Sequence, residues 1–176
     1  MPLLGEESDD EELSFNDHWR NIMEPTFFAA YLERLENLHE NLRQQIEGLP
    51  VEAMDWVPGV EMNSIAVLLA HTLGSLRFWI GDIALGEPSG RIREREFETR
   101  GVSSQEMQQR LDTSLAYAHG AVTRLSVEDL EKVAPVVPEA YEPVSVSWAL
   151  LHALEHAYLH LGQIQLTSQL WKAHAA

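Results

Sequence analysis

Residues 152–166 read HALEHAYLHLGQIQL, and this stretch decides how the rest of the chain is interpreted. Three histidines, His152, His156 and His160, stand four residues apart in otherwise apolar sequence. Side chains at this spacing lie on one face of an α-helix, with Cβ atoms about 5–6 Å apart. The stretch therefore predicts a helix whose histidines either bind a metal ion or pack in the core.

Apolar residues at helical spacing extend this helix and predict three more, with no strand. The predicted helices cover approximately residues 25–47, 64–86, 103–125 and 145–171. The first is expected to start at Pro25, and the second to be capped by Asn63 or Ser64. A capping box of Ser103 and Glu106 is expected to open the third, and the fourth is expected to begin near Ser145 or Ser147. The connections between them are long, and they cover residues 49–62, 86–102 and 133–144. The expected fold is all-α, a four-helix bundle with long inter-helix connections.

The chain has a formal net charge of −16, and six acidic residues stand in the segment EESDDEE at 6–12. Residues 1–14 are expected to be a disordered acidic tail, and residues 15–176 a single bundle domain. An acidic surface repels phosphate backbones, which excludes nucleic acid as an expected partner. No apolar stretch is long enough to span a membrane, and no signal peptide is recognisable, so the expected location is cytoplasmic.

The chain contains no cysteine, so a metal site would use histidines and carboxylates. His156 and His160 have the spacing from which two imidazoles reach one ion. His71, in the second predicted helix, is the best third candidate, because the small residues Gly74 and Ser75 beside it are expected to leave room for an ion and a ligand. The alternative is that each histidine is a core residue whose ring nitrogens are hydrogen-bonded within the protein.

Several residues near these histidines have two interpretations. His152 is expected to lie beside the site, either orienting a ligand or packing, and the alternative is that it is a fourth ligand. Gln163 either orients a bound water or makes a hydrogen bond that closes helix packing, and Glu155 is expected to be a solvated carboxylate. The run RIREREFETR at 91–100 is expected to be a solvated loop with local ion pairs. A role in holding an anionic substrate is the alternative for its arginines, Arg91, Arg93 and Arg95.

The fourth predicted helix is apolar on nearly all sides, whereas a bundle helix usually keeps one polar face. Its second apolar side, away from the histidines, consists of Leu150, Leu151, Leu154, Tyr158, Leu161, Leu166 and Leu170. We therefore expect a homodimer that pairs through this helix.

Three motifs carry a resemblance to a known family. They are H-x-x-G-S-x-x-x-W-I-G-D from His71, E-H-x-x-x-H-x-G-Q-I from Glu155, and D-W-x-P-G-x-x-x-N-S from Asp55. Over roughly residues 27–171 the chain resembles the DinB-like superfamily, which includes YfiT-type metal hydrolases and bacillithiol- and mycothiol-dependent transferases.

The resemblance implies a commonly dimeric four-helix bundle with a divalent metal, zinc or else nickel or iron, held by His71, His156 and His160. From their helical positions beside these histidines, His152, Gln163 and Ser75 are expected to surround the ligands. Related enzymes activate a low-molecular-weight thiol or water for transfer to an electrophilic small molecule. The alternative is a non-catalytic dimeric bundle that acts as a metal-binding or stress-linked module. The chain departs from many relatives at Ala157 and Leu161, where they have Glu and Arg, so contacts made there in relatives do not carry over.

Overall fold

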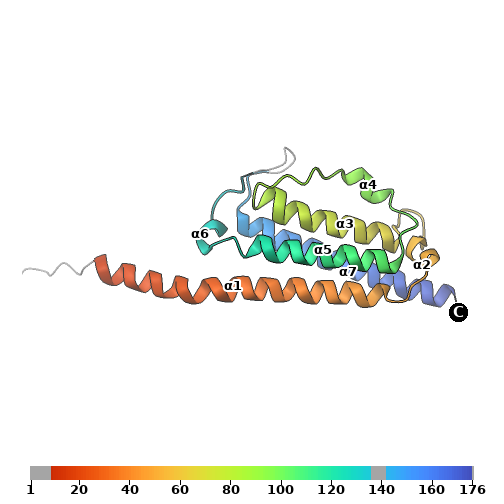
Figure 1. Cartoon of the computed structure of the whole chain (residues 1–176), viewed down its shortest axis with the longest axis horizontal. Helices are drawn as coiled ribbons and strands as arrows, with labels where there is room; N and C mark the ends of the chain where they lie inside the picture. Colours follow the sequence, from red (N-terminus) through yellow and green to blue (C-terminus); the bar gives the residue numbers. More distant parts are fainter. Residues whose placement is uncertain (1–8, 136–141, 176) are drawn as a thin grey trace, which may run out of the picture.

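The computed structural model describes residues 9–135 and 142–175, and the side chains from Thr26 onward. Four long helices lie side by side (Figure 1). They are α1 (Asp9–Ile46), α3 (Ile65–Arg77), α5 (Ser104–Val122) and α7 (Val146–His174). A π-helical turn, η1 (Phe78–Ile83), continues α3, and three short helices stand in the connections: α2 (Val51–Asp55), α4 (Arg93–Phe97) and α6 (Val127–Leu130). The described residues form no strand, which confirms the all-α bundle.

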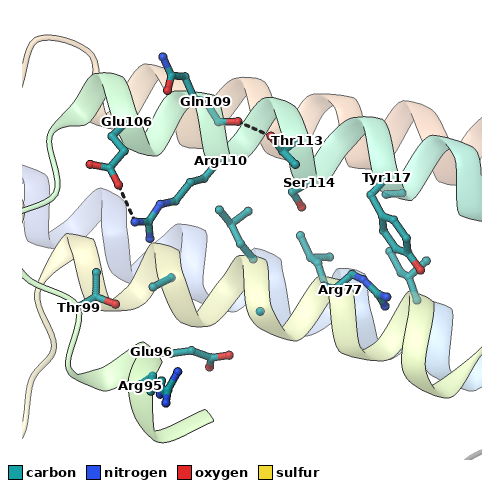
Figure 2. Close-up of a pocket in the computed structure, with 16 residues that line it drawn as sticks. Arg77, Arg95, Glu96, Thr99, Glu106, Gln109, Arg110, Thr113, Ser114 and Tyr117 are labelled. Carbon is teal, nitrogen blue, oxygen red and sulfur yellow. Dashed lines mark hydrogen bonds and ion pairs between the residues drawn. The ribbon is translucent and has the colours of Figure 1, made fainter. Parts of the chain in front are cut away.

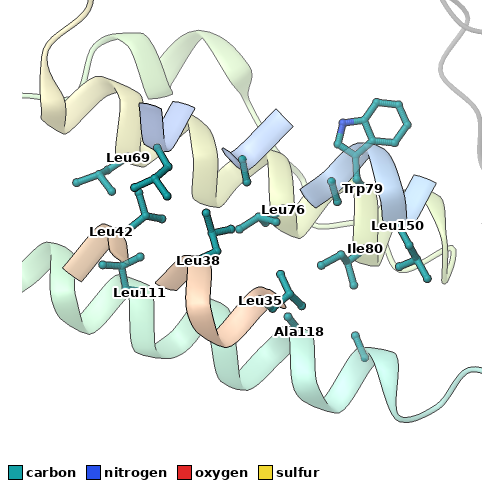
Figure 3. Close-up of a cluster of buried hydrophobic side chains, with 14 of the residues drawn as sticks. Leu35, Leu38, Leu42, Leu69, Leu76, Trp79, Ile80, Leu111, Ala118 and Leu150 are labelled. Carbon is teal, nitrogen blue, oxygen red and sulfur yellow. The ribbon is translucent and has the colours of Figure 1, made fainter. Parts of the chain in front are cut away.

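Each long helix packs on two others, so that the bundle closes in the order α1, α5, α3, α7. Their apolar stripes meet in one core, seen in Figure 3, where leucines of α1, α3, α5 and α7 converge. Burying a leucine side chain contributes roughly 1.5–3 kcal/mol, which makes this core the main source of stability. Of these pairings, that of α3 with α7 positions the candidate site, because the two helices carry His71, His156 and His160.

Serine caps fix where three of the long helices begin. The side chains of Ser64, Ser103 and Ser145 accept hydrogen bonds from backbone N–H groups three residues ahead. Each bond satisfies an N–H that has no partner within the helix. The predicted starts of the second, third and fourth helices are therefore confirmed, with Ser64 rather than Asn63 as the cap.

The first helix is longer than predicted, because α1 begins at Asp9 and passes through Pro25 without ending. Proline inside a helix removes one backbone hydrogen bond, but the residues before it contain no other helix breaker back to Gly5. Acidic residues at the start, from Asp9 to Glu12, also favour a helix N-terminus. Residues 9–14 of the expected tail thus belong to α1, and residues 1–8 lie outside the described residues.

The connection between η1 and α5 is not a plain loop. It contains α4, which packs against α3 on the outside of the bundle (Figure 1). This placement brings the charged run at 91–100 next to His71. Among the described residues, no helix has both the length and the apolarity needed to cross a membrane.

Candidate metal site

Three histidines from two helices meet where α3 packs on α7. His71 projects from α3, and His156 and His160 project from α7 one turn apart. One ring nitrogen from each lies within 4.8 Å of the other two. The ring centroid of His71 is 5.1 Å from that of His156 and 5.0 Å from that of His160. The structure thus brings together the three residues that the sequence nominated.

The outer nitrogen of His71 is held by a carboxylate. Its Nδ1 lies 2.8 Å from Oε2 of Glu96, and both side chains are almost buried, at 9% and 11% exposure. Arg91 bonds the same carboxylate twice, with Nε at 2.6 Å from Oε1 and a terminal nitrogen at 2.8 Å from Oε2. The carboxylate therefore links the segment before α5 to the histidine cluster.

Burial raises the pKa of Glu96, but the hydrogen bonds from Arg91 and His71 outweigh it and lower the pKa overall. An ionised Glu96 accepts a hydrogen bond from Nδ1–H of His71. This fixes the tautomer in which Nε2 of His71 keeps its lone pair, the arrangement common to metal-binding histidines.

His160 is oriented in the same way by a different group. Its Nδ1 lies 2.7 Å from Oε1 of Gln163, which can only accept a hydrogen bond. Its Nε2 lies 3.2 Å from Nε2 of His156. The Nδ1 of His156 is buried and has no hydrogen-bond partner among the described residues. Two of the three imidazoles therefore have fixed tautomers that direct Nε2 inward.

The cluster favours neutral imidazoles. Burial, and then the neighbouring His160 and His71, lower the pKa of His156 to about 4. Burial also lowers the pKa of His160, although its bond to Gln163 acts in the opposite direction. Neutral rings have lone pairs to donate at neutral pH, which is the protonation state that a metal ion requires.

These observations fit a divalent metal ion. Three imidazole nitrogen donors from two helices, two of them oriented by outer hydrogen bonds, form a donor set suited to Zn²⁺ with one position left for another ligand. Imidazole donors also suit nickel and iron. A purely structural histidine would direct both of its nitrogens to oxygen acceptors or donors instead.

The predicted neighbours occupy distinct places. His152 lies 5.8 Å from His156, ring to ring, and stacks on Trp148 with centroids 4.8 Å apart. Ser75 is buried on α3, one turn beyond His71. Gln163 makes the hydrogen bond to His160, in agreement with the alternative that assigns it a bond within the protein. Glu155 is exposed.

Two expectations about the surroundings were wrong. The space beside Gly74 is not free for an ion: a Cβ there would overlap the Glu96 carboxylate, so the missing side chain makes room for Glu96. The run at 91–100 is not a wholly solvated loop, because Glu96 and Arg91 are nearly buried. The charges tolerate burial because each is paired and hydrogen-bonded.

The arginines of this run have different surroundings. Arg91 donates hydrogen bonds to Glu96, and one of its terminal nitrogens lies 3.4 Å from Nδ1 of His71. Arg93 lies over the ring of Phe97, and that ring in turn lies 5.1 Å from the ring of His71. The contacts of Glu96 and Phe97 with His71 were not predicted, since neither residue has a spacing in the chain that relates it to His71. Gly74 was the available signal, because a glycine within a helix can mark the close approach of another group.

Comparison with known proteins agrees with the fold. A family model described as the DinB superfamily matches residues 34–164. A conserved protein from Enterococcus faecalis is similar in structure, with 19% identity, a TM-score of 0.65, and coverage of 81% of this chain and 95% of that chain. A protein from Streptococcus pneumoniae has 17% identity, a TM-score of 0.61, and coverage of 83% and 90%. No curated protein matches at a significant level.

Proposed function

This chain belongs to the DinB superfamily, and we propose that it is a divalent-metal-dependent enzyme that activates a low-molecular-weight thiol or water for transfer to an electrophilic small molecule. The observation that supports this most directly is the convergence of His71, His156 and His160, with their ring nitrogens within 4.8 Å. We assign the three histidines as the metal ligands, with zinc as the expected ion and nickel or iron as alternatives.

The chemistry of such a site follows from its charge. A divalent ion held by three neutral ligands keeps its full charge and lowers the pKa of a bound thiol or water, so that a nucleophile forms near neutral pH. Transfer of a thiol is preferred over hydrolysis because the family resemblance includes thiol-dependent transferases.

Neighbouring side chains fix the ring orientation of two of the proposed ligands. Glu96 holds Nδ1–H of His71, and Gln163 holds Nδ1–H of His160, so both rings keep their direction when no ion is bound. The ring of Phe97 packs against the ring of His71, with centroids 5.1 Å apart. Preorganised ligands pay less ordering entropy when the ion binds, which increases affinity.

Elemental analysis tests the metal assignment. The protein should be purified without a nickel column, and we expect close to one metal ion per chain. Replacement of His71, His156 or His160 by alanine should remove it. His119→Ala is the matched control, because His119 is a partly exposed histidine on α5 whose partner is Glu36. Metal-free wild-type protein that also fails to take up added zinc would contradict the assignment.

A second experiment tests the reaction. Metal-loaded protein is incubated with electrophilic substrates, with and without small thiols, and substrate loss is followed by mass spectrometry. We expect loss that depends on both the metal and a thiol or water, and that disappears in His156→Ala. Stoichiometric metal without any turnover would instead favour the non-catalytic binding module.

We also propose that two copies pair through α7. Leu150 and Leu161 of the predicted interface are buried in the chain's own core, so the surface must be formed by other residues. An exposed stripe runs along α7 beside the histidine face, with members three or four residues apart. It consists of Trp148, Leu151, Leu159, Leu166 and Leu170, with Glu155 and Gly162 between them. An apolar stripe of this spacing is typical of helix–helix contacts.

Sedimentation at micromolar concentration tests the pairing. We expect a dimer for the wild type and a monomer for Leu159→Glu, because a carboxylate in the middle of the stripe would be buried without a partner. Val60→Glu is the control, since Val60 is 94% exposed and lies in the connection before α3. A wild-type monomer would refute the proposed dimer without affecting the metal assignment.

A further inference from the structure

A cavity of about 720 Å³ lies between α3 and α5, and part of the α4 segment closes it on one side (Figure 2). Small-molecule sites commonly have volumes of roughly 300–1,000 Å³. Its floor is apolar and consists of Ala70, Leu73, Leu76, Ile80 and Ala118. Arg95, Thr99, Arg110 and Thr113 are among the polar residues that also line it. The cavity therefore has the size and the mixed lining of a binding site.

The cavity is separate from the histidine cluster. None of His71, His156 and His160 lines it. The two regions meet at Glu96, which lines the cavity, accepts a hydrogen bond from Nδ1 of His71 and packs against Gly74. A ligand in the cavity would thus lie on the far side of the Glu96 side chain from the proposed metal ligands.

Among the described residues that line the cavity, one cation has no ion-pair partner. Most charged lining residues form ion pairs: Arg77 with Asp82, Glu96 with Arg91, and Arg110 with Glu106. Arg95 is an exposed residue, and its guanidinium makes no hydrogen bond or ion pair with any residue that the structure describes. In a chain with a net charge of −16, this leaves a local excess of positive charge at the cavity.

A second arginine, Arg110, can bind an anion together with Arg95 at little cost in stability. The pair of Arg110 and Glu106 is a single helix turn on α5, with side chains 45% and 50% exposed. Such exposed pairs contribute little to stability, so an incoming anion can replace Glu106 as the partner of Arg110. Figure 2 shows Arg95 and Arg110 toward one end of the cavity, with Arg77 and Tyr117 toward the other.

We propose that this cavity binds a small organic anion with an apolar body, such as an alkyl or aryl carboxylate. The body lies on the apolar floor between α3 and α5, and the carboxylate bonds Arg95 and Arg110. A guanidinium and a carboxylate form short, charge-assisted hydrogen bonds that fix orientation as well as affinity. The site needs no metal ion and is therefore independent of the proposed reaction.

Calorimetric titration of the full-length protein with octanoate tests the proposal. We expect one octanoate per chain, and binding at least about tenfold weaker for octylammonium, because the free charge in the cavity is positive. Binding should persist in the presence of a chelator, so that a failure of the metal assignment would not affect this result. Equal affinity for the two ligands, or no binding of octanoate, would overturn the proposal.

Paired variants locate the ligand. Arg95→Gln should weaken octanoate binding about tenfold through loss of a charge-assisted bond. Arg93→Gln should have less than about a twofold effect, because Arg93 is on the same short helix but does not line the cavity. Equal effects of the two changes would contradict the assigned position of the carboxylate.

A steric variant tests the floor. Ala70→Phe fills the cavity and should abolish binding, whereas Ala30→Phe on the exposed side of α1 should leave it unchanged. If Ala70→Phe does not fold, methyl NMR of the wild type gives the same information. Octanoate should then shift the methyl signals of Leu73 and Ile80 and leave those of Leu166 unchanged. Shifts confined to Leu166 would refute the site.

Discussion

Two regions of the bundle bury histidines and use them differently. Between α1 and α5, His39 is 2% exposed; its Nδ1 bonds the backbone oxygen of Leu35 at 2.8 Å, and its Nε2 lies 3.4 Å from the hydroxyl of Ser114. Between α3 and α7, His156 directs Nε2 toward another imidazole and leaves Nδ1 without a partner among the described residues. In the first region both ring nitrogens of the histidine contact oxygen atoms of the protein, and in the second they do not.

The difference shows which property separates a core histidine from a candidate ligand. Burial lowers the pKa of both His39 and His156, so a lowered pKa does not distinguish them. The hydrogen-bond partners of the ring nitrogens distinguish the two histidines. A core histidine is bonded to oxygens on both sides, whereas a ligand keeps one nitrogen directed to a point that it shares with other donors.

The largest expected effect is on stabilisation by metal. Zinc at about 1,000 times its Kd should add about 4 kcal/mol to the free energy of unfolding, because the ion binds the native state only. His156→Ala should abolish this gain, and His39→Ala should retain it. Thermal denaturation with zinc and with chelator measures both. If both variants lost the stabilisation by zinc equally, the distinction between His156 as a ligand and His39 as a core residue would be wrong.

In metal-free protein, His39→Ala should be the more destabilising of the two substitutions. His39→Ala leaves a void in the core and removes the partner of the half-buried Ser114 hydroxyl, and should cost about 2–3 kcal/mol. His156→Ala removes a half-buried ring with one unsatisfied nitrogen, and should cost less. Urea denaturation in the presence of chelator measures the two values. A larger loss for His156→Ala would mean that its ring has a structural role.

A smaller effect is expected from the carboxylate behind His71. Glu96→Gln keeps the shape but weakens the hydrogen bond to Nδ1, and should lower metal affinity roughly 10–100-fold, the usual effect of such outer partners. Competition with a chromogenic chelator measures the affinity. Glu98→Gln, an exposed neighbour in sequence, is the control and should leave affinity unchanged.

The smallest expected effect is on the pH dependence of metal-free protein. Burial lowers the pKa of His39 below its ordinary value of 6.5, although the carbonyl of Leu35 raises it in part, and Arg43, Asp112 and His119 add further charges nearby. The unfolded chain therefore binds a proton that the folded chain does not. The stability that this histidine contributes is present above about pH 6.5 and falls as the pH decreases below it.

Replacement of His39 by leucine removes this titration. The variant should lose less stability than the wild type between about pH 7.5 and pH 5.5, as measured by urea denaturation with chelator present. A wild type and a variant with the same pH dependence would indicate that His39 is protonated equally in the folded and unfolded chains.

Local sequence was sufficient for most of the fold. Ser64, Ser103 and Ser145 begin their helices as expected, because a cap depends on residues within one turn. The start of α1 was predicted at Pro25 and found at Asp9, because a proline weakens a helix without necessarily ending it. The three histidines could also be predicted from the sequence, since His156 and His160 are neighbours on one helix and His71 lies on the apolar edge of another.

The amino-acid sequence by itself determined the four helices, the absence of thiol ligands and the pair of histidines on α7, because these depend on spacing within a few residues. Tertiary structure decided the rest. The carboxylate that orients His71 comes from Glu96, 25 residues away, and the cavity combines side chains of three helices. Contacts of this kind depend on how helices and connections pack, and the spacing of residues along a chain does not encode them locally.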